Sequence, residues 1–415
     1  MAMLHPDDEA FAKANILTDE TIGNLFKSKL GLQPVHISCP EKQGSFHKVY
    51  FVSLPHLEGH PWSGRSLVLR VSRKTIVKLK TENEIAFLQL LQNSKIPVPQ
   101  VVFFSSDLNN SLGYEYDCVE RIQHPCLSEV WSTFSSRQLD KILDQLVEIF
   151  LELSAVDVPR VYGSLALNSQ PAPVLEETMW QIPDIERYFY APPYNLQLET
   201  FLSLNPGGFY TSWPEYISAF LKTYHHIISI HPSVQFLSTI LDPLQALINI
   251  LDSAEASWVQ SLRDSPRLRP RIAHRDLHFD NILVDADGTI KAVIDWEFAG
   301  IGAAFSSRSS IIDNCTGFLR HHGFYPDNPI AKLIVDTWPT EFQTRLERRA
   351  PEVAAIWAQT IDRDTVLGVE GNALSDVREY LRACLEVAIR GHERTEKAKT
   401  DWKEVVVKNL QVLGF

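Results

Sequence analysis

Three side chains between residues 271 and 302 have the types that phosphate chemistry needs: Asp276, Asn281 and Asp295. Magnesium prefers oxygen ligands and usually takes only one or two carboxylates together with phosphate oxygens. The amide oxygen of Asn281 and the carboxylate of Asp295 fit that preference. A separate carboxylate such as Asp276 can orient an acceptor hydroxyl and take its proton, provided that it lies within hydrogen-bond reach. Phosphoryl transfer from ATP needs mainly such positioning and neutralisation of charge.

A predicted β-hairpin would bring these three side chains together. Apolar residues 282–284 and the largely β-branched residues 290–294 flank Asp287-Gly288, a dipeptide typical of hairpin turns. Because a hairpin folds its two ends toward each other, we expect Asn281 and Asp295 to lie side by side. Asp276 would lie on the loop just before them.

The spacing of these residues is more specific than their types. Each of the three alone would more often be a cap or a turn former. Together, the order His-Arg-Asp, four residues, Asn, hairpin and Asp is that of a protein-kinase catalytic loop followed by its metal-binding Asp. This combined pattern favours a functional interpretation. We expect His274 to be a buried, hydrogen-bonded strut, whereas His278 could be a strut or a site contact.

Residues 274–281 (HRDLHFDN) and 294–297 (IDWE) resemble the aminoglycoside phosphotransferase and choline kinase superfamily, which shares the protein-kinase fold but phosphorylates small molecules. The resemblance implies Asp276 as catalytic base and Asn281 with Asp295 as magnesium ligands. Arg275, where many members carry Gly, is closer to protein kinases. A small-molecule kinase is favoured by His278 in place of Lys, by Asp-Trp-Glu in place of Asp-Phe-Gly, and by the lack of a downstream Ala-Pro-Glu.

The residues before this core predict a small β-rich lobe that would bind the nucleotide. Helices are expected over residues 7–14 and 18–30, followed by strand, turn and strand over residues 35–52 with Gly44 at the turn. A glycine there lets the backbone come close to phosphates. By resemblance, Gly44 and Ser45 belong to the nucleotide loop, although a lone glycine in a hairpin is usually only a turn.

Residues 66–71 (SLVLRV) have the pattern of the third strand, on which kinases place a Lys that reaches the phosphates and pairs with a Glu of the next helix. Arg70 occupies that position, and Glu84 follows in a helix predicted over residues 81–91. Arg can form a bidentate pair and contact phosphate, but it is not equivalent to an ammonium. Glu82 is the alternative partner, and an exposed Arg on an edge strand is the structural alternative.

A strand predicted over residues 114–122 would leave the small lobe and enter the hinge, whose backbone binds adenine in kinases. By resemblance, Glu120, Arg121 and Ile122 form that hinge. The domain boundary is therefore expected here, with a nucleotide-binding lobe over residues 1–122 and a catalytic and substrate-binding lobe over residues 123–415.

The large lobe is predicted to be mainly helical. Residues 138–155 carry apolar side chains at helical spacing, and residues 236–263 and 303–415 indicate further helices. Residues 156–230 are less regular and rich in aromatic residues, which could shape an acceptor pocket or simply pack beneath long loops. Acids of the last segment are candidate ligands for an amine-bearing acceptor, or else part of a solvated helix face: Asp313, Glu370, Asp376 and Glu379.

Composition excludes several classes of function. Hydrophobic residues make up 45% and charged residues 22%, which is ordinary for a globular protein. A net charge of −12 argues against nucleic-acid binding, which needs a basic surface. The five scattered cysteines indicate neither a disulfide framework nor a zinc site. We expect no signal peptide, no apolar run of membrane-spanning length, and a cytoplasmic location.

These observations predict an α+β, protein-kinase-like bilobal fold with ATP and Mg²⁺ between a small β-rich lobe and a larger helical lobe. The predicted reaction moves the γ-phosphoryl group of ATP to a hydroxyl of a small molecule. Asp276 would deprotonate the hydroxyl, while Arg70 and Glu84 steady the phosphates. Three alternatives stay open: a protein kinase, a nucleotide-binding scaffold without turnover, and a helical interaction protein whose core merely resembles a kinase. The acceptor cannot be chosen among aminoglycoside, choline-like amine, sugar, homoserine and secondary metabolite.

Overall fold

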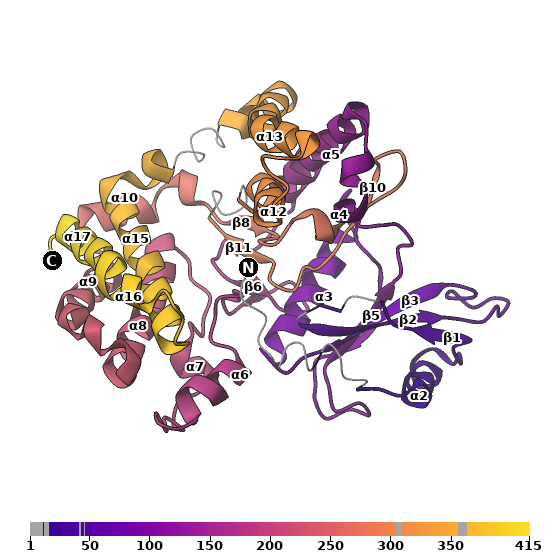
Figure 1. The fold of residues 1–415 in the computed structure, drawn as a ribbon, viewed down its shortest axis with the longest axis horizontal. Coiled ribbons are helices and arrows are strands. Elements are labelled where there is room, and N and C mark those ends of the chain that lie inside the picture. Colours follow the sequence, from indigo (N-terminus) through magenta and orange to yellow (C-terminus); the bar gives the residue numbers. More distant parts are fainter. Residues whose placement is uncertain (1–10, 12–15, 41–42, 45, 304–308, 356–362) are drawn as a thin grey trace.

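The computed structural model describes residues 11, 16–40, 43–44, 46–303, 309–355 and 363–415. It confirms the predicted two-lobed fold, with a small antiparallel sheet in the N-terminal part and a predominantly helical remainder (Figure 1). The domain boundary near residue 122 stays a prediction. Most of the helix expected over residues 7–14 lies outside the described residues.

The small lobe is a five-stranded sheet in the order β1-β2-β3-β5-β4, with antiparallel neighbours. Alternate residues of β3 turn to opposite faces, so Leu67, Leu69 and Val71 are buried on one side while Arg70 faces the other. Helix α2, Asp19–Leu30, covers the apolar face through Ile22 and its neighbours. The strands are β1 His36–Ser38, β2 His47–Ser53, β3 Ser66–Ser72, β4 Val101–Ser105 and β5 Tyr116–Glu120.

Helix α3, Leu79–Leu91, connects the two lobes. Its C-terminal half packs Phe87, Leu88 and Leu91 into the apolar cluster of the large lobe. Its N-terminal half carries buried polar residues, Lys80 and Glu84 among them, and faces the junction between the lobes. The helix therefore joins an apolar contact at one end to a charged contact at the other.

One part of the large lobe supports the predicted catalytic hairpin. The hairpin forms as expected, with β9 Ile282–Val284 antiparallel to β10 Ile290–Val293 and Gly288 at positive φ in the turn. Helix α5, Ser136–Ala155, holds this turn because Gln145 donates to the carbonyl of Gly288 at 2.8 Å and accepts from the Ile290 amide at 2.9 Å. The apolar cluster that receives the C-terminal half of α3 also includes residues of α5, of α12 Asn314–His321 and of α13 Pro329–Arg349.

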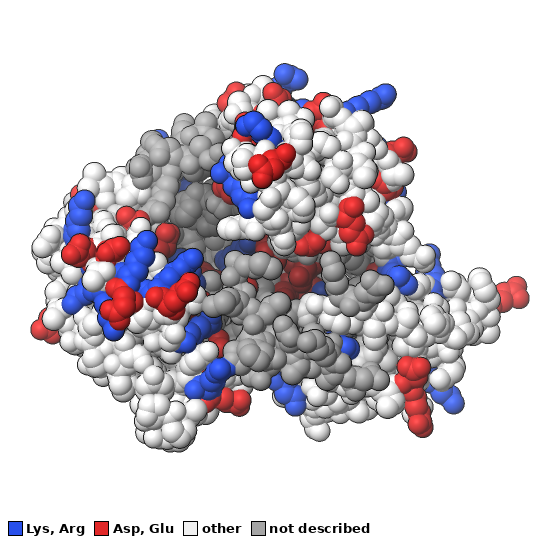
Figure 2. All heavy atoms as spheres, viewed as in Figure 1, with Lys and Arg blue, Asp and Glu red and all other residues white. Residues whose placement is uncertain are grey.

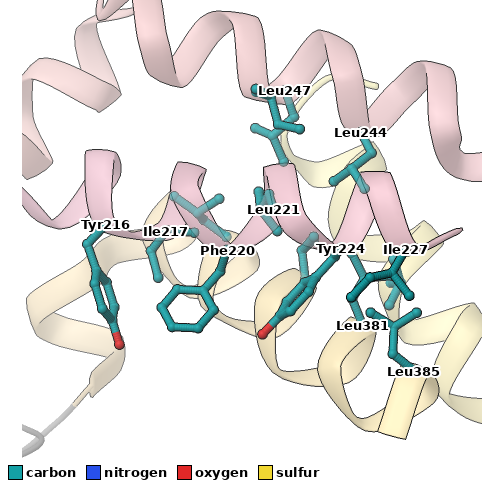
Figure 3. Packing of buried hydrophobic residues seen from close by; sticks show 14 of the residues in the cluster. Tyr216, Ile217, Phe220, Leu221, Tyr224, Ile227, Leu244, Leu247, Leu381 and Leu385 are labelled. Carbon is teal, nitrogen blue, oxygen red and sulfur yellow. The ribbon is translucent and has the colours of Figure 1, made fainter. Parts of the chain in front are cut away.

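A second helical cluster forms the other part of the large lobe, to the left in Figure 1. Figure 3 shows Tyr216, Phe220 and Tyr224 of one helix packed between neighbouring helices, with Leu244 and Leu381 beside them. The helices here include α8 Trp213–Ile230, α9 Leu241–Ser253, the short α10 Ser257–Arg263, α15 Arg363–Ile389 and α17 Lys403–Val412.

Residues 156–230 were expected to be less regular, and this description fits residues 156–212 but not helix α8 over Trp213–Ile230. Ser212 caps its first turn and Pro214 occupies a first-turn position, where the missing amide costs nothing. Aromatic residues of this helix, Tyr216, Phe220 and Tyr224 among them, lie on its buried face. Residues 156–212 contain only short elements among the described residues: β6 Ser164–Leu165, β7 Pro171–Ala172, α6 Ile182–Ile185, a π-helical turn over Glu186–Tyr190, and α7 Phe201–Leu204.

The stretch Pro232–Ser253 differs from the expectation that no apolar run approaches membrane-spanning length. By length and composition alone this stretch is long and apolar enough to cross a membrane, and 39% of its most apolar part is buried inside the protein. Leu244, Leu247 and Leu251 pack in the second helical cluster. A core helix of this kind passes the same test.

Candidate active site

The hairpin brings together the three side chains from which the site was predicted. Asn281 follows the loop between β8, Arg271–Ala273, and β9, and its Nδ2 donates to the Asp276 carbonyl at 2.8 Å and to Asp276 Oδ2 at 3.3 Å. The Ile294 amide donates to the Asn281 carbonyl at 3.0 Å. Asp295, the next residue, therefore lies directly beside Asn281. The amide nitrogen of Asn281 is thus used by the loop, and its oxygen is the atom that could bind an ion.

His274 ties the loop to the end of β10. Its Nε2 lies 2.9 Å from the Ile294 carbonyl, and its Nδ1 accepts from the Asp276 amide at 3.3 Å. Burial lowers the pKa of His274 to about 4, although Asp276 opposes the shift. The ring also packs on Trp296, 4.5 Å between centroids. His274 is therefore buried and neutral near pH 7.

Asp295 lies at the mouth of the site. Its backbone is left-handed, with φ 67°, and its side chain is 35% exposed. Carboxylate oxygens of Asp295, Glu84 and Glu297 lie within 4.8 Å of one another. Burial raises the pKa of Asp295, Arg70 opposes that shift, and Asp276 adds to it. Glu84 pairs with Arg70 and Glu297 pairs with Lys80, so Asp295 is the carboxylate of the three that we assign to a hard divalent cation such as Mg²⁺.

Arg70 is held by two acids at once. Its Nε lies 3.0 Å from Asp117 Oδ1, its Nη2 donates to Asp117 Oδ2 at 3.1 Å, and Nη2 also pairs with Glu84. Its Nη1 lies 3.9 Å from Asp295 Oδ1. Burial lowers the pKa of Arg70, but Asp117 and Glu84 outweigh burial and raise it well above its usual value. The structure thus pairs Arg70 with Glu84, as the sequence favoured, whereas Glu82 accepts from Ser106 at 2.8 Å.

The nucleotide-loop and hinge residues lie at opposite ends of the small sheet, because the start of β2 pairs with the end of β3 while Glu120 pairs with Leu67 near its start. Gly44 precedes β2, and a Cβ built on it would meet no described atom within 4 Å, so packing does not require a glycine there. Ser45 lies outside the described residues. Glu120 ends β5, and its carboxylate accepts from Arg65 Nη1 at 2.9 Å. The Ile122 carbonyl accepts from the His124 amide at 3.0 Å. Their roles in binding a nucleotide stay predictions.

His278 contacts the predicted base. Its Nε2 lies 3.5 Å from Asp276 Oδ2, and its ring stacks on Phe318. Burial lowers the pKa of His278, but the hydrogen bond and charge of Asp276 outweigh burial and raise it. The Asp276 side chain is 48% exposed and so can reach an acceptor. Figure 2 shows acidic side chains in the hollow at the centre of the molecule, between the two lobes.

Arg275 fastens the catalytic loop to the segment before α6. Its backbone φ is 70°, and its Nη1 donates to the Leu175 carbonyl at 2.5 Å. The guanidinium fills the space beside Gly300 in β11, Gly300–Gly302, where an added Cβ would lie 2.5 Å from Cζ. The Arg275 carbonyl accepts from Asn314 of α12 at 3.0 Å. Arg275 is therefore a structural link between the loop and its surroundings.

The acids predicted from the C-terminal segment are spread over two helices. Asp313 immediately precedes α12, next to the residue that bonds the catalytic loop, while Glu370, Asp376 and Glu379 belong to α15. Their binding of an acceptor stays a prediction. Glu177 is one acid that the sequence reasoning missed. Burial raises its pKa, and the nearby charge of Asp276 raises it further.

Two further groups were missed by the sequence reasoning. Asp117 sits opposite Arg70 in the β3–β5 ladder, and a charge inside an otherwise buried strand was the available signal. Lys80 lies one helical turn before Glu84 and therefore on the same face of α3. Its partner is Glu297, at 2.7 Å.

The small sheet, the helical lobe and the charged loop between them define a two-lobed protein of the protein-kinase-like class. The model of the phosphotransferase enzyme family (APH) matches residues 44–306, which is more than half of the chain. The chain belongs to this family. The resemblance inferred from residues 274–297 is thereby confirmed.

Curated relatives include fungal proteins. A subtelomeric hrmA-associated cluster protein of Aspergillus fumigatus is 24% identical over 314 residues, covering 63% of this chain and 58% of that protein. Clavilactone A biosynthesis cluster protein Y of Ampulloclitocybe clavipes is 28% identical over 232 residues, covering 54% and 51%. The chain thus spans a little more than half the length of these relatives.

Solved structures with a similar chain path include two phosphotransferases. Aminoglycoside phosphotransferase APH(4)-Ia, in a complex with ADP and hygromycin B, is 17% identical, with a TM-score of 0.47 and coverage of 94% of this chain and 98% of that one. Macrolide 2'-phosphotransferase type I is 14% identical, with a TM-score of 0.44 and coverage of 94% and 99%.

Proposed function

We propose that this protein transfers the γ-phosphoryl group of ATP to a hydroxyl of a small molecule. The observation that carries the proposal is the convergence of Asp276, Asn281 and Asp295 at the junction of the lobes. Membership of the phosphotransferase family supports it. A cytoplasmic location is part of the proposal and rests on the scattered cysteines of the sequence.

Asp276 is the proposed general base. In the reaction, a bond forms between the acceptor oxygen and the γ-phosphorus, the bond from that phosphorus to the β,γ-bridging oxygen breaks, and Asp276 receives the hydroxyl proton. Asn281 and Asp295 would hold Mg²⁺, which neutralises phosphate charge when bound. The Nη1 of Arg70, near Asp295, is the part of that guanidinium which could face a phosphate.

The acceptor is proposed to be a hydroxylated metabolite. One relative is named as a cluster protein of clavilactone A biosynthesis, which supports a metabolite rather than a protein substrate. Glu177 lies close enough to Asp276 for the two charges to interact, so it adds negative charge near the proposed base. This charge weakly favours acceptors that carry an amine.

The experiment is a screen of hydroxylated metabolites with Mg-ATP, followed by mass spectrometry for a gain of one phosphate. Asp276→Asn serves as the blank, because it keeps the size of the side chain and removes the base. Loss of a general base should lower kcat by about 100-fold or more. Phosphate transfer only to proteins, or a signal equal in the Asp276→Asn variant, would contradict the proposal.

A nucleotide-binding scaffold without turnover is the second candidate. The observation in its favour is that Asp117 and Glu84 occupy most of the Arg70 guanidinium, so Arg70 is less able than a lysine to reach phosphates. The scaffold predicts a rise in melting temperature with Mg-ATP but no product with any acceptor. An enzyme predicts the rise in melting temperature and also a phosphorylated product. In Asp276→Asn the rise should remain and the product should disappear.

A further inference from the structure

A buried ion pair joins α3 to the segment that follows Asp295. Lys80 is only 1% exposed, and its Nζ lies 2.7 Å from Glu297 Oε2. His47 Nδ1 approaches the same oxygen at 3.5 Å, and the Phe46 ring lies 4.8 Å from the ammonium. We refer to Lys80 and Glu297 together as the α3 clasp. It connects two elements that are more than two hundred residues apart in the sequence.

The backbone beside Glu297 is held by the same helix. Asn83 Nδ2 donates to the Glu297 carbonyl at 3.2 Å and to the Ala299 carbonyl at 2.8 Å. The Asn83 oxygen accepts from the Leu165 amide at 3.0 Å, which fixes the orientation of the amide. The segment that begins at Asp295 is thus fastened to α3 through both its side chain and its main chain.

The clasp also determines how the charges around Asp295 are distributed. Carboxylate oxygens of Glu84, Asp295 and Glu297 lie within 4.8 Å of one another, where like charges repel. The Nη2 of Arg70 pairs with Glu84, and only its Nη1 approaches Asp295, at 3.9 Å from Oδ1. Lys80 is the cation that contacts Glu297 directly. Without Lys80, Glu297 would be a buried carboxylate beside the proposed metal ligand.

We propose that Lys80 is a positioning residue for the metal site: by holding Glu297 it fixes the segment that carries Asp295 in the orientation that binds Mg²⁺. Lys80 acts through Glu297 and does not itself touch a phosphate. The inference rests on the proposed function and assigns to the α3 clasp a task separate from that of Arg70, which binds the small sheet to the same helix.

The alternative is that the clasp only stabilises the fold. Replacing one partner of a buried ion pair usually destabilises a protein strongly, whereas replacing both with uncharged groups can restore stability. The double variant therefore separates the two ideas. A clasp that only stabilises the fold would give a double variant with restored stability and normal magnesium binding.

The test uses Lys80→Met, the double variant Lys80→Met/Glu297→Gln, and Lys74→Met, which removes an exposed lysine facing the Tyr114 ring, as the matched control. The measurement is the rise in melting temperature that ADP causes at increasing Mg²⁺, which needs no acceptor. The readout is the Mg²⁺ concentration that gives half of this rise, together with the melting temperature of each protein alone.

We expect Lys80→Met to melt well below the natural protein and the double variant to recover most of that loss. Both should need about 10-fold more Mg²⁺, the size of effect seen when a group that orients a metal ligand is removed. Lys74→Met should behave as the natural protein. A double variant with the natural Mg²⁺ requirement would overturn the positioning role, as would a lowered requirement in Lys80→Met.

Failure of this inference and failure of the proposed function give different results. If ADP and Mg²⁺ together do not raise the melting temperature of the natural protein, the proposed function fails, and the positioning role fails with it. If the natural protein responds and the double variant responds at the same Mg²⁺ concentration, only the role of Lys80 is overturned.

Discussion

Replacing Arg70 with lysine, the residue that kinases carry at this position, should destabilise this protein. The guanidinium makes two parallel contacts to Asp117, at 3.0 and 3.1 Å, and a further contact to Glu84. A lysine ammonium is a point charge and cannot reproduce this bidentate geometry. It could serve one of the two acids but not both.

The magnitude follows from the contacts that are lost. At least two charge-assisted hydrogen bonds disappear, each contributing about 1.5 kcal/mol, so Arg70→Lys should lower the free energy of unfolding by about 3 kcal/mol. Burial already raises the pKa of Asp117 to about 6 despite Arg70, so an acid left without its partner would become protonated near neutral pH. At about 2 °C per kcal/mol, the melting temperature should fall by about 6 °C.

Arg65→Lys is the matched control for this measurement. Arg65 is also in the small lobe and pairs with Glu120 at 2.9 Å, but its side chain is 54% exposed. Exposed pairs contribute little, so Arg65→Lys should lower stability by less than about 0.5 kcal/mol. Differential scanning fluorimetry and urea denaturation measure both variants. If Arg70→Lys is as stable as Arg65→Lys, Arg70 does not hold the two acids in the way described.

Further predictions concern a buried acid and a crowded glycine. Burial raises the pKa of Glu115 to about 7, although its bond from the Lys78 amide opposes the shift. An acid that binds its proton more tightly in the folded protein lowers the free energy of unfolding as pH rises from about 4.5 to about 7. The loss is at most about 3 kcal/mol. Glu115→Gln should therefore gain stability over the natural protein across that window in urea denaturation, and parallel pH profiles would contradict this. Gly300→Ala should displace the Arg275 guanidinium and lower turnover by about 10-fold. Gly302→Ala is the control, because its added Cβ would lie 3.5 Å from Arg275 Nη2, which is an ordinary contact. Equal turnover in the two variants would refute the crowding argument.

Local patterns in the sequence were enough to predict the central loop and hairpin. A turn dipeptide between two β-branched runs predicts a hairpin, and a hairpin necessarily brings its two ends together. Asn281 and Asp295 are neighbours for that reason, through the bond from Ile294 to Asn281. The pairing of Arg70 with Glu84 was predicted from the kinase arrangement, in which a basic residue of the third strand pairs with a Glu of the next helix.

Contacts between distant elements were not predictable from such patterns. Lys80 belongs to a helix and Glu297 to the segment after a hairpin, and the sequence pattern of each segment predicts its own structure without indicating a contact with the other. Asp117 could be noticed only as a charge within a buried strand, and its partner depends on β3 lying beside β5, with β4 outside. Helix α8 was missed because its buried stripe is aromatic, with Tyr216, Phe220 and Tyr224, and aromatic clusters also occur under loops.

The charges at the N-terminal half of α3 need an explanation beyond stability. Buried ion pairs are often no more stabilising than apolar side chains of the same size, because the charges must first lose their water. This helix nevertheless buries Lys80 against Glu297 and Glu84 against Arg70, while its other half packs with Phe87 and other apolar residues. An apolar contact could hold the helix equally well, but it could not set the direction of a carboxylate. The charged half lies against the strand and the loop that surround Asp295, so these pairs are best understood as fixing the geometry of the site.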